Sequence, residues 1–194
     1  MMATRPICLA SASPRRRELL ERYGLRVEVH PPGVEERALP GESPEAQVAR
    51  LARSKARSAA PHHPDALVIG GDTVVVLGEA VLGKPRDREE GEAMLRRLSG
   101  RTHRVLSAYH LLDGPSGEWL GRTVETRVTF RQLPEAWIAW YGSLPEMLDK
   151  AGAYAIQGVG GAMIERIEGS YTNVVGFPVE CVLWDLIDRG WVRI

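Results

Sequence analysis

A strand that leads through a turn into a helix can be read from ICLASASPRRRELL, residues 7–20. The segment 5–10, with its apolar run 7–10, predicts a buried strand, and the residues after it predict a turn and a helix that runs to about Tyr23. Ser13 can cap this helix, and Pro14 suits its first position because the missing amide hydrogen would be unpaired there anyway. Such strand–helix units are the building blocks of α/β folds.

The rest of the chain continues this alternation and adds a long hairpin. We expect the strands at 25–30, 66–69, 73–77, 80–82, 102–112, 119–130 and 162–167, and the helices from Ser43 to before Pro61 and at 87–98, 134–141 and 178–189. The pairing of 102–112 with 119–130 as a hairpin favours a mixed, twisted sheet flanked by helices over a purely parallel one.

Composition bounds the class of protein. The chain has 194 residues, 44% of them hydrophobic and 26% charged, which is typical of an ordinary globular protein. Its 25 basic and 25 acidic residues cancel, so the net charge does not favour binding to nucleic acid or to an acidic membrane surface. No internal repeat or linker divides the chain, and we expect a single domain over 1–194.

No targeting or membrane segment is expected. The first six residues carry one cation and precede an apolar run too short for a signal peptide. The longest apolar-rich stretch, 66–83, is interrupted by Asp72 and Glu79. Two cysteines far apart in sequence, Cys8 and Cys181, suit packing in a reducing compartment better than a disulfide. These features predict a cytoplasmic protein without a membrane partner.

The turn at 11–14 has the features of a phosphate site. Backbone amides at a helix N-terminus attract anions, and the hydroxyls of Ser11 and Ser13 can donate to phosphate oxygens. Arg15 and Arg16 can grip phosphate in bidentate fashion, whereas the helical spacing directs Arg17 to solvent. The alternative is a capped helix with a basic first turn, but cations are disfavoured at that position unless an anion compensates them.

Lysines are scarce and fall near other candidate site residues. Of the 25 basic residues only Lys55, Lys84 and Lys150 are lysines. A compact ammonium and a planar guanidinium are not interchangeable at a phosphate, so these three lysines are candidates for phosphate contacts. A solvated surface lysine is the ordinary alternative for each.

A glycine pair precedes Asp72. Gly70 and Gly71 permit a positive φ or the close approach of a ligand, which would leave Asp72 at the end of a strand beside a cleft. A carboxylate there can hold Mg²⁺ or orient a water molecule. A turn aspartate bonded to backbone amides is the alternative.

Gln157 lies in a small-residue stretch that ends in glycines. Its amide presents a donor and an acceptor side by side, which is complementary to the imide edge of uracil or thymine. The following glycines do not make a dinucleotide-binding fingerprint, because Met163 stands where the third glycine is required. No P-loop motif is present, which removes the main support for a kinase or GTPase.

Several motifs taken together resemble the Maf family of nucleoside triphosphate pyrophosphatases. In chain order they are LASASPRRRELL (9–20), GDT (71–73), GKP (83–85), LSGRTH (98–103), DKAGAY (149–154) with Gln157-Gly158, GSY (169–171) and GFP (176–178). They span nearly the whole chain. The resemblance implies an α/β fold similar to the inosine triphosphate pyrophosphatases, with a cleft between two lobes.

The resemblance also implies an activity and a site. The expected reaction is hydrolysis of dTTP and UTP to the monophosphate and pyrophosphate with a divalent cation, Mg²⁺ or Mn²⁺, as part of nucleotide-pool house-cleaning. Asp72 matches the proton acceptor. The other matches are phosphate and metal positions at Ser11, Arg16, Glu36, Lys55 and Lys84, and specificity positions at Arg15, Thr73 and Gln157.

Other functions remain open from the sequence. The same fold could act on 7-methyl-GTP or another modified nucleotide, or bind nucleotides without turnover as a regulator of septum formation, a process associated with the family. The set of Lys55, Asp72 and Lys84 favours turnover, since a binder would not require it. A homodimer is expected from the resemblance only.

Overall fold

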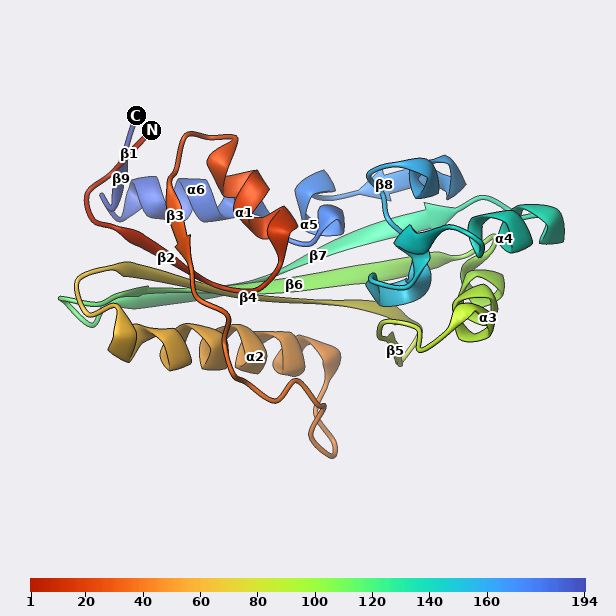
Figure 1. Ribbon diagram of the computed structural model, residues 1–194, viewed down its shortest axis with the longest axis horizontal. Helices are drawn as coiled ribbons and strands as arrows, with labels where there is room; N and C mark the ends of the chain where they lie inside the picture. Colours follow the sequence, from red (N-terminus) through yellow and green to blue (C-terminus); the bar gives the residue numbers. More distant parts are fainter. The chain divides into compact units, whose positions relative to one another are not determined.

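The computed structural model describes residues 1–194 as a mixed α/β protein (Figure 1). The strands are β1 (Met2–Ala3), β2 (Ile7–Ala10), β3 (Val27–Val29), β4 (Leu67–Leu77), β5 (Ala80–Leu82), β6 (Thr102–Asp113), β7 (Trp119–Phe130), β8 (Ile164–Glu168) and β9 (Val192–Arg193). The α-helices are α1 (Pro14–Glu21), α2 (Pro44–Ala59), α3 (Arg88–Leu98), α4 (Glu135–Tyr141), α5 (Tyr171–Val175) and α6 (Val179–Asp188). Short 3₁₀ turns are η1 (Ala60–His62), η2 (Pro145–Met147), η3 (Ala151–Ala153) and η4 (Val159–Met163).

The main sheet has seven strands in the order β3-β2-β4-β6-β7-β8, with β5 paired to β4. β2 is parallel to both β3 and β4, whereas β5 is antiparallel to β4 and β8 is antiparallel to β7. A separate antiparallel pair, β1 with β9, holds the two ends of the chain side by side (Figure 1). The expected mixed sheet flanked by helices is confirmed.

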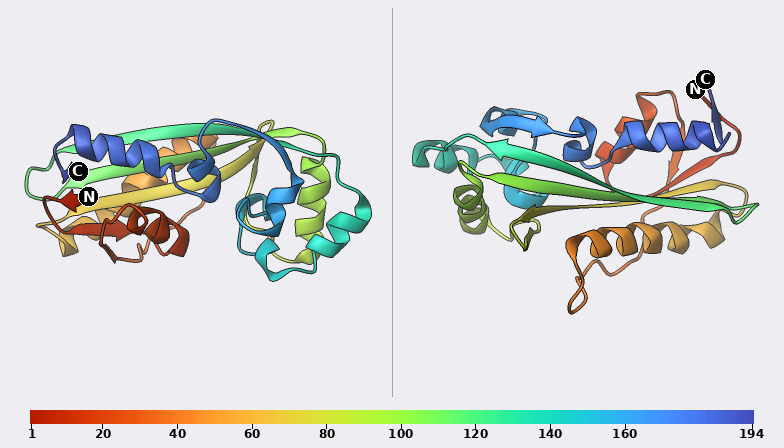
Figure 2. Two further views of the ribbon diagram at one scale, coloured as in Figure 1. Left: turned by 90° about the horizontal axis from the view of Figure 1, so that it is seen from above. Right: turned by 180° about the vertical axis from the view of Figure 1, so that it is seen from behind.

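The chain forms two compact units. Unit 1 comprises Met1–Asp72, Ser107–Val124 and Gly176–Ile194, and unit 2 comprises Thr73–Leu106 and Glu125–Val175. In unit 1, α2 covers one face of the sheet, and α1 and α6 lie on the opposite face (Figures 1 and 2). No helix in the chain combines the length and the apolar character needed to cross a membrane.

Helix α2 forms as its sequence pattern predicts. The Ser43 hydroxyl caps it by accepting a hydrogen bond from the Ala46 amide at 3.2 Å. Its apolar stripe, Val48, Leu51, Ala52 and Ala56, is completely or almost completely buried. This stripe fixes the rotation of the helix about its axis and therefore the direction in which its polar side chains extend.

The expected break before Asp72 is wrong, because β4 runs without interruption from Leu67 to Leu77. Neither glycine of the pair has a positive φ. A Cβ at Gly70 would lie 2.2 Å from the Ala52 carbonyl oxygen, and one at Gly71 would lie 3.1 Å from the Phe177 ring. The glycines therefore allow α2 and Phe177 to pack closely against β4. Asp72 lies within β4 rather than at a strand end.

Gly70→Ala is expected to destabilise the protein by about 1–3 kcal/mol or more, because α2 must shift to admit the methyl group. Urea unfolding would show a lower midpoint with an unchanged slope. The matched control is Gly33→Ala in a loop of unit 1, where a Cβ meets nothing within 4 Å. Equal midpoints for the two variants would contradict the role given to Gly70.

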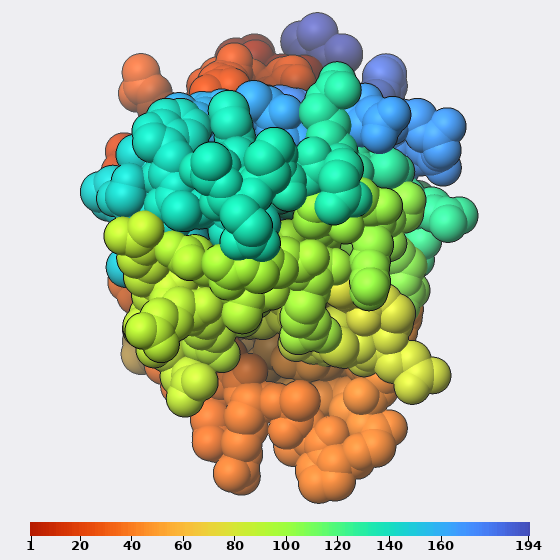
Figure 3. All heavy atoms as spheres, turned by 90° about the vertical axis from the view of Figure 1, so that its right-hand side faces the viewer, coloured from red at the N-terminus to blue at the C-terminus, as the bar shows by residue number.

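Unit 2 contains α3 and α4 side by side, as seen on the face shown in Figure 3. The Arg88 guanidinium donates to the Ala139 carbonyl at 2.8 Å, and Arg96 pairs with Glu135 at 2.9 Å. Both helices were expected from the sequence. The short helix α5 was not expected, and the glycine-rich stretch before β8 contains the turns η3 and η4.

Candidate active site

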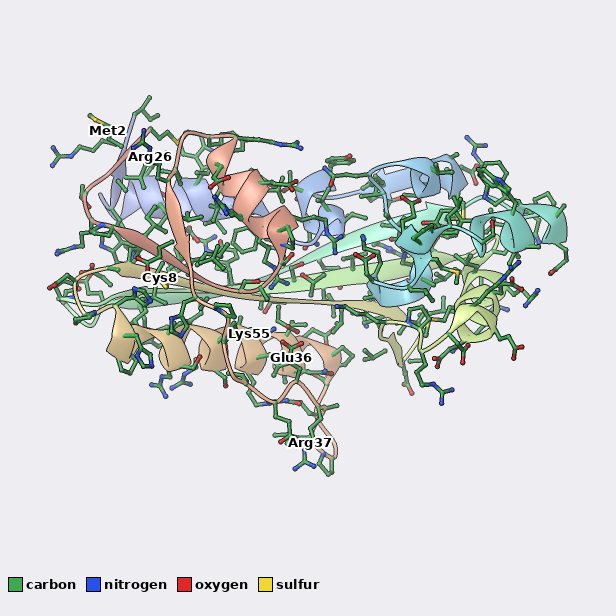
Figure 4. The ribbon with its side chains drawn as sticks, viewed as in Figure 1. Met2, Cys8, Arg26, Glu36, Arg37 and Lys55 are labelled. Carbon is green, nitrogen blue, oxygen red and sulfur yellow. The ribbon has the colours of Figure 1, made fainter.

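A buried ammonium group lies between two carboxylates in unit 1. Lys55 Nζ is 2.7 Å from Asp72 Oδ1 and 2.6 Å from Glu36 Oε1. Lys55 and Asp72 are almost fully buried, whereas the Glu36 side chain is 57% exposed. Figure 4 shows Glu36 reaching toward Lys55, with Arg37 farther along the same loop. The cluster therefore has one open side, which is formed by the Glu36 loop.

Three different elements supply these side chains. Asp72 comes from β4 and Lys55 from α2, which are brought together by the close packing at Gly70. The loop with Glu36 is tied to α2 through Arg50, which pairs with Glu42 at 2.6 Å and donates to the Arg37 carbonyl at 3.0 Å. The segment that follows Glu36 is thus held against the helix that carries Lys55.

Arg16 is fixed by backbone and hydroxyl oxygens at the start of α1. Its Nη1 donates to the Gly71 carbonyl at 2.7 Å and to Ser11 Oγ at 3.0 Å. Its Nε donates to the Gly176 carbonyl at 3.1 Å. Ser11 Oγ also accepts a hydrogen bond from the Ser13 amide at 3.2 Å. The guanidinium is therefore held in one orientation before any ligand is present.

Burial dominates the electrostatics of this cluster. It raises the pKa of the Asp72 carboxyl above its usual range, although the nearby charges of Lys55 and Arg16 act in the opposite direction. Burial also lowers the pKa of Arg16, an effect opposed by Asp72 and Glu36. The arrangement combines a carboxylate of increased basicity with two cations, which suits proton abstraction beside an anionic substrate.

The structure thus brings five of the expected residues together: Ser11, Arg16, Glu36, Lys55 and Asp72. Ser13 and Arg15 are close to Ser11 and Arg16 in the sequence, and both are half-buried. The Ser13 hydroxyl makes no capping hydrogen bond with α1. Arg17 is exposed and pairs with Glu21 at 2.7 Å, which confirms the prediction that it faces solvent.

The remaining expected residues belong to unit 2. Thr73 follows Asp72 on β4 and is half-buried, and Lys84 is exposed. Gln157 is half-buried, and its side-chain amide has no hydrogen-bond partner within the chain. Lys150 contacts the neighbouring Asp149.

Sequence reasoning assigned no role to three residues that build the site. Gly176 supplies a carbonyl to Arg16 at a φ of 122°, a conformation that favours glycine. Phe177 packs on Gly71, and Arg50 secures the Glu36 loop. The GFP motif at 176–178 was the available signal, but nothing in it indicates that a carbonyl oxygen is the functional group.

The carboxylates of Asp72 and Glu36 are the groups of this cluster that could hold a divalent cation. Their oxygens converge on a single cationic atom, Lys55 Nζ, so the two groups already point to a common region. Mg²⁺ is commonly held by one or two carboxylates together with substrate phosphates and water. The donor set is therefore suited to a metal that arrives with a phosphate ligand.

Comparison with known proteins places the chain in a family. Residues 6–188 match the family described as Maf-like protein. The chain belongs to the Maf family. Both units lie almost entirely within the matched range, and so do all the candidate site residues. The resemblance based on separate sequence motifs is confirmed.

Curated relatives of the Maf family are similar over most of this chain. A dTTP/UTP pyrophosphatase of Myxococcus xanthus is 53% identical over 89% of this chain and 87% of its own. A protein of the same name from Syntrophus aciditrophicus is 46% identical over 97% of this chain and 92% of its own. Another from Deinococcus radiodurans is 49% identical over 91% of this chain and 89% of its own.

The solved structure of the Staphylococcus aureus Ham1 protein has a similar fold. It matches with a TM-score of 0.52 and 17% identity, covering 95% of this chain and 99% of that one. At this level of identity, the likeness concerns the fold alone. It agrees with the mixed α/β architecture described above.

Proposed function

We propose that this Maf-family chain hydrolyses dTTP and UTP to the nucleoside monophosphate and pyrophosphate. The observation that carries the proposal is the buried Asp72–Lys55 pair next to the fixed Arg16. The choice of dTTP and UTP as substrates rests on relatives named dTTP/UTP pyrophosphatase, which are 46–53% identical over most of the chain. Nucleotide pools in the cytoplasm would be the setting of this reaction.

Phosphate binding rests on the start of α1. Arg16 presents a guanidinium whose orientation is set by the carbonyls of Gly71 and Gly176, and the N-terminus of α1 adds backbone amides and a favourable dipole. Ser11, Ser13, Lys55 and Lys84 complete the proposed phosphate contacts. Their positive charge and hydrogen bonds stabilise the charge that develops on departing pyrophosphate.

Asp72 is the proposed proton acceptor. Cleavage between the α- and β-phosphates requires a water molecule directed at the α-phosphorus and a group that takes its proton. Burial raises the pKa of Asp72 and so increases its basicity, while Lys55 at 2.7 Å acts in the opposite direction by stabilising the ionised carboxylate. With its pKa raised by burial, Asp72 is a stronger base than a surface aspartate.

A divalent cation, Mg²⁺ or Mn²⁺, completes the proposal. Within the cluster, the positive charges of Arg16 and Lys55 are matched by the negative charges of Asp72 and Glu36. A strongly anionic triphosphate therefore needs further positive charge on binding. Asp72 and Glu36 would hold the cation, which supplies neutralisation of the phosphate oxygens when bound.

Base selection is assigned to Gln157, with Arg15 and Thr73 as further specificity residues. The unpaired amide of Gln157 can donate to a carbonyl and accept from the imide N–H of uracil or thymine. Cytosine lacks that N–H. A purine differs in size as well as in its hydrogen-bonding edge.

Gln157→Glu is expected to reduce the preference for UTP over CTP by about tenfold, because the carboxylate cannot donate a hydrogen bond to the pyrimidine carbonyl. The measurement is the ratio of kcat/KM for the two substrates. Gln132→Glu, a change of the same kind at another position of unit 2, is the control. An unchanged ratio in the Gln157 variant would remove this residue from base recognition.

The proposed function itself is tested with purified protein, Mg²⁺ and five substrates: dTTP, UTP, CTP, GTP and 7-methyl-GTP. Release of pyrophosphate, rather than phosphate, from dTTP and UTP is expected. Turnover of 7-methyl-GTP alone would retain the mechanism but change the substrate. Tight binding without turnover would favour a nucleotide-binding regulator, for instance of septum formation. The expected homodimer stays a prediction, for which the molar mass in solution is the test.

A further inference from the structure

A pocket lies in unit 1 outside the cluster at Asp72, with the exposed side of α2 as one wall and parts of β6 and β7 as the other. Its volume is about 610 Å³, which is within the usual range for small-molecule sites of ~300–1,000 Å³. Arg50, Arg53, Ser54 and Arg57 line the α2 wall at helical spacing. Lys55 is about 200° around the helix from Arg53 and Arg57, so the side chains of these two arginines extend away from the cluster at Asp72.

The charge of this pocket is unbalanced. Four arginines line it and no acidic residue does. Arg50 pairs with Glu42 at 2.6 Å, and Arg122 pairs with Asp185 at 2.7 Å. Arg53 and Arg57 are exposed and have no acidic partner. These two are four residues apart on one helix, a spacing at which like charges repel each other. An anion between them would relieve that repulsion.

An aromatic surface adjoins the two unpaired arginines. The Trp119 indole stacks on the His110 ring with centroids 5.2 Å apart and an interplanar angle of 21°, and it remains 59% exposed. The Arg53 guanidinium lies over the indole, 6.0 Å from the ring centroid, in a cation–π contact. Gly121 leaves room for this stack, since a Cβ there would lie 3.2 Å from His110 Nδ1. Burial and the neighbouring arginines lower the pKa of His110 to about 4, so the ring is neutral at pH 7.

We propose that this pocket binds a nucleoside monophosphate as a second, non-catalytic site. The base stacks on the exposed indole of Trp119, and the phosphate is held by Arg53 and Arg57. A phosphate monoester carries about −1.5 to −2 charges at pH 7, which matches the two unpaired guanidinium groups. Stacking on an aromatic ring and contact with arginine are the two usual elements of nucleotide recognition. A volume of about 610 Å³ is that of a small-molecule site, which favours a single nucleotide over a strand.

Calorimetric titration of the full chain with UMP tests the proposal. The variants are Trp119→Ala and the double variant Arg53→Ala/Arg57→Ala, which alter exposed side chains outside the catalytic cluster. The matched controls are Trp184→Ala, an indole that is 63% exposed on α6, and Arg26→Ala, another exposed arginine of unit 1 (Figure 4). We expect the Kd for UMP at this site to rise about 5- to 150-fold in the pocket variants and to stay unchanged in the controls.

Hydrolysis of dTTP is measured in parallel and is expected to be the same in all these variants. Because UMP binding is measured directly, a chain without pyrophosphatase activity would refute the proposed function and leave this site intact. UMP affinity that is equal in wild type and pocket variants, or absent in both, would overturn the second site. Inorganic phosphate that binds as tightly as UMP, with no effect of Trp119→Ala, would overturn the nucleotide assignment. An oligonucleotide that binds to the protein when UMP does not bind would also overturn the nucleotide assignment.

Discussion

Asp72→Asn is expected to lower kcat for dTTP by about 10²- to 10⁴-fold, the range for loss of a general base. The amide keeps the size of the side chain but cannot take a proton from water. It also removes one of the two negative charges next to Lys55. Pyrophosphate release under single-turnover conditions measures the chemical step separately from product release.

Asp65→Asn serves as the matched control, since this aspartate is exposed in the loop before β4. Circular dichroism should show the same secondary structure for both variants. An Asp72→Asn protein with the turnover of the wild type would exclude Asp72 as the base. A folded variant that binds dTTP but has lost turnover would support the proposed role.

Lys55→Met is expected to shift the acid limb of kcat/KM to higher pH. Lys55 lowers the pKa of Asp72, so its removal raises further a pKa that burial has already raised. Asp72 must be ionised to act as a base, and a higher pKa means that activity is lost at a higher pH as the solution is acidified. The pH profile of kcat/KM reports this pKa in the free enzyme.

The same variant is expected to lose about 3–5 kcal/mol of stability at neutral pH, because it leaves a buried carboxylate without its main partner. A carboxyl group whose pKa is raised on folding stabilises the protein below its unfolded pKa, and this contribution is lost as the pH rises through the folded pKa. Unfolding of Lys55→Met should therefore become easier as the pH rises through that range, more steeply than for the wild type.

The double variant Lys55→Met/Asp72→Asn separates charge from packing. With the carboxylate replaced by an amide, the variant should recover most of the lost stability, and the pH dependence due to Asp72 should disappear. A double variant as unstable as Lys55→Met would show that the loss comes from packing of the side chain. An acid limb that does not move in the single variant would show that Lys55 does not control the ionisation of Asp72.

Periodic patterns along the chain predicted the regular elements well. Helix α2 follows from Ser43 as a cap and from an apolar stripe at helical spacing, and both are local properties of the sequence. The glycine pair before Asp72 was interpreted wrongly, since a glycine required by a turn and one required by a close neighbour look alike in sequence. Only the 2.2 Å between a Cβ at Gly70 and the Ala52 carbonyl decides between them.

The candidate site was less accessible to sequence reasoning than the fold. Residue types and family resemblance indicated Asp72, Lys55 and Arg16, but spacing in sequence could not show that a single ammonium bridges Asp72 and Glu36. The role of Gly176 was also hidden, because its contribution is a backbone carbonyl 160 positions away from Arg16. Backbone groups are present at every residue and leave no signature in the side-chain pattern.

The three hydrogen bonds that hold Arg16 have a thermodynamic consequence for ligand recognition. A free arginine side chain loses about 2 kcal/mol of rotamer entropy when it becomes ordered. In this protein the ordering occurs during folding, since Ser11, Gly71 and Gly176 already fix the guanidinium. The triphosphate therefore meets a preorganised donor, and calorimetry should find a smaller entropic penalty than for a phosphate captured by mobile surface arginines.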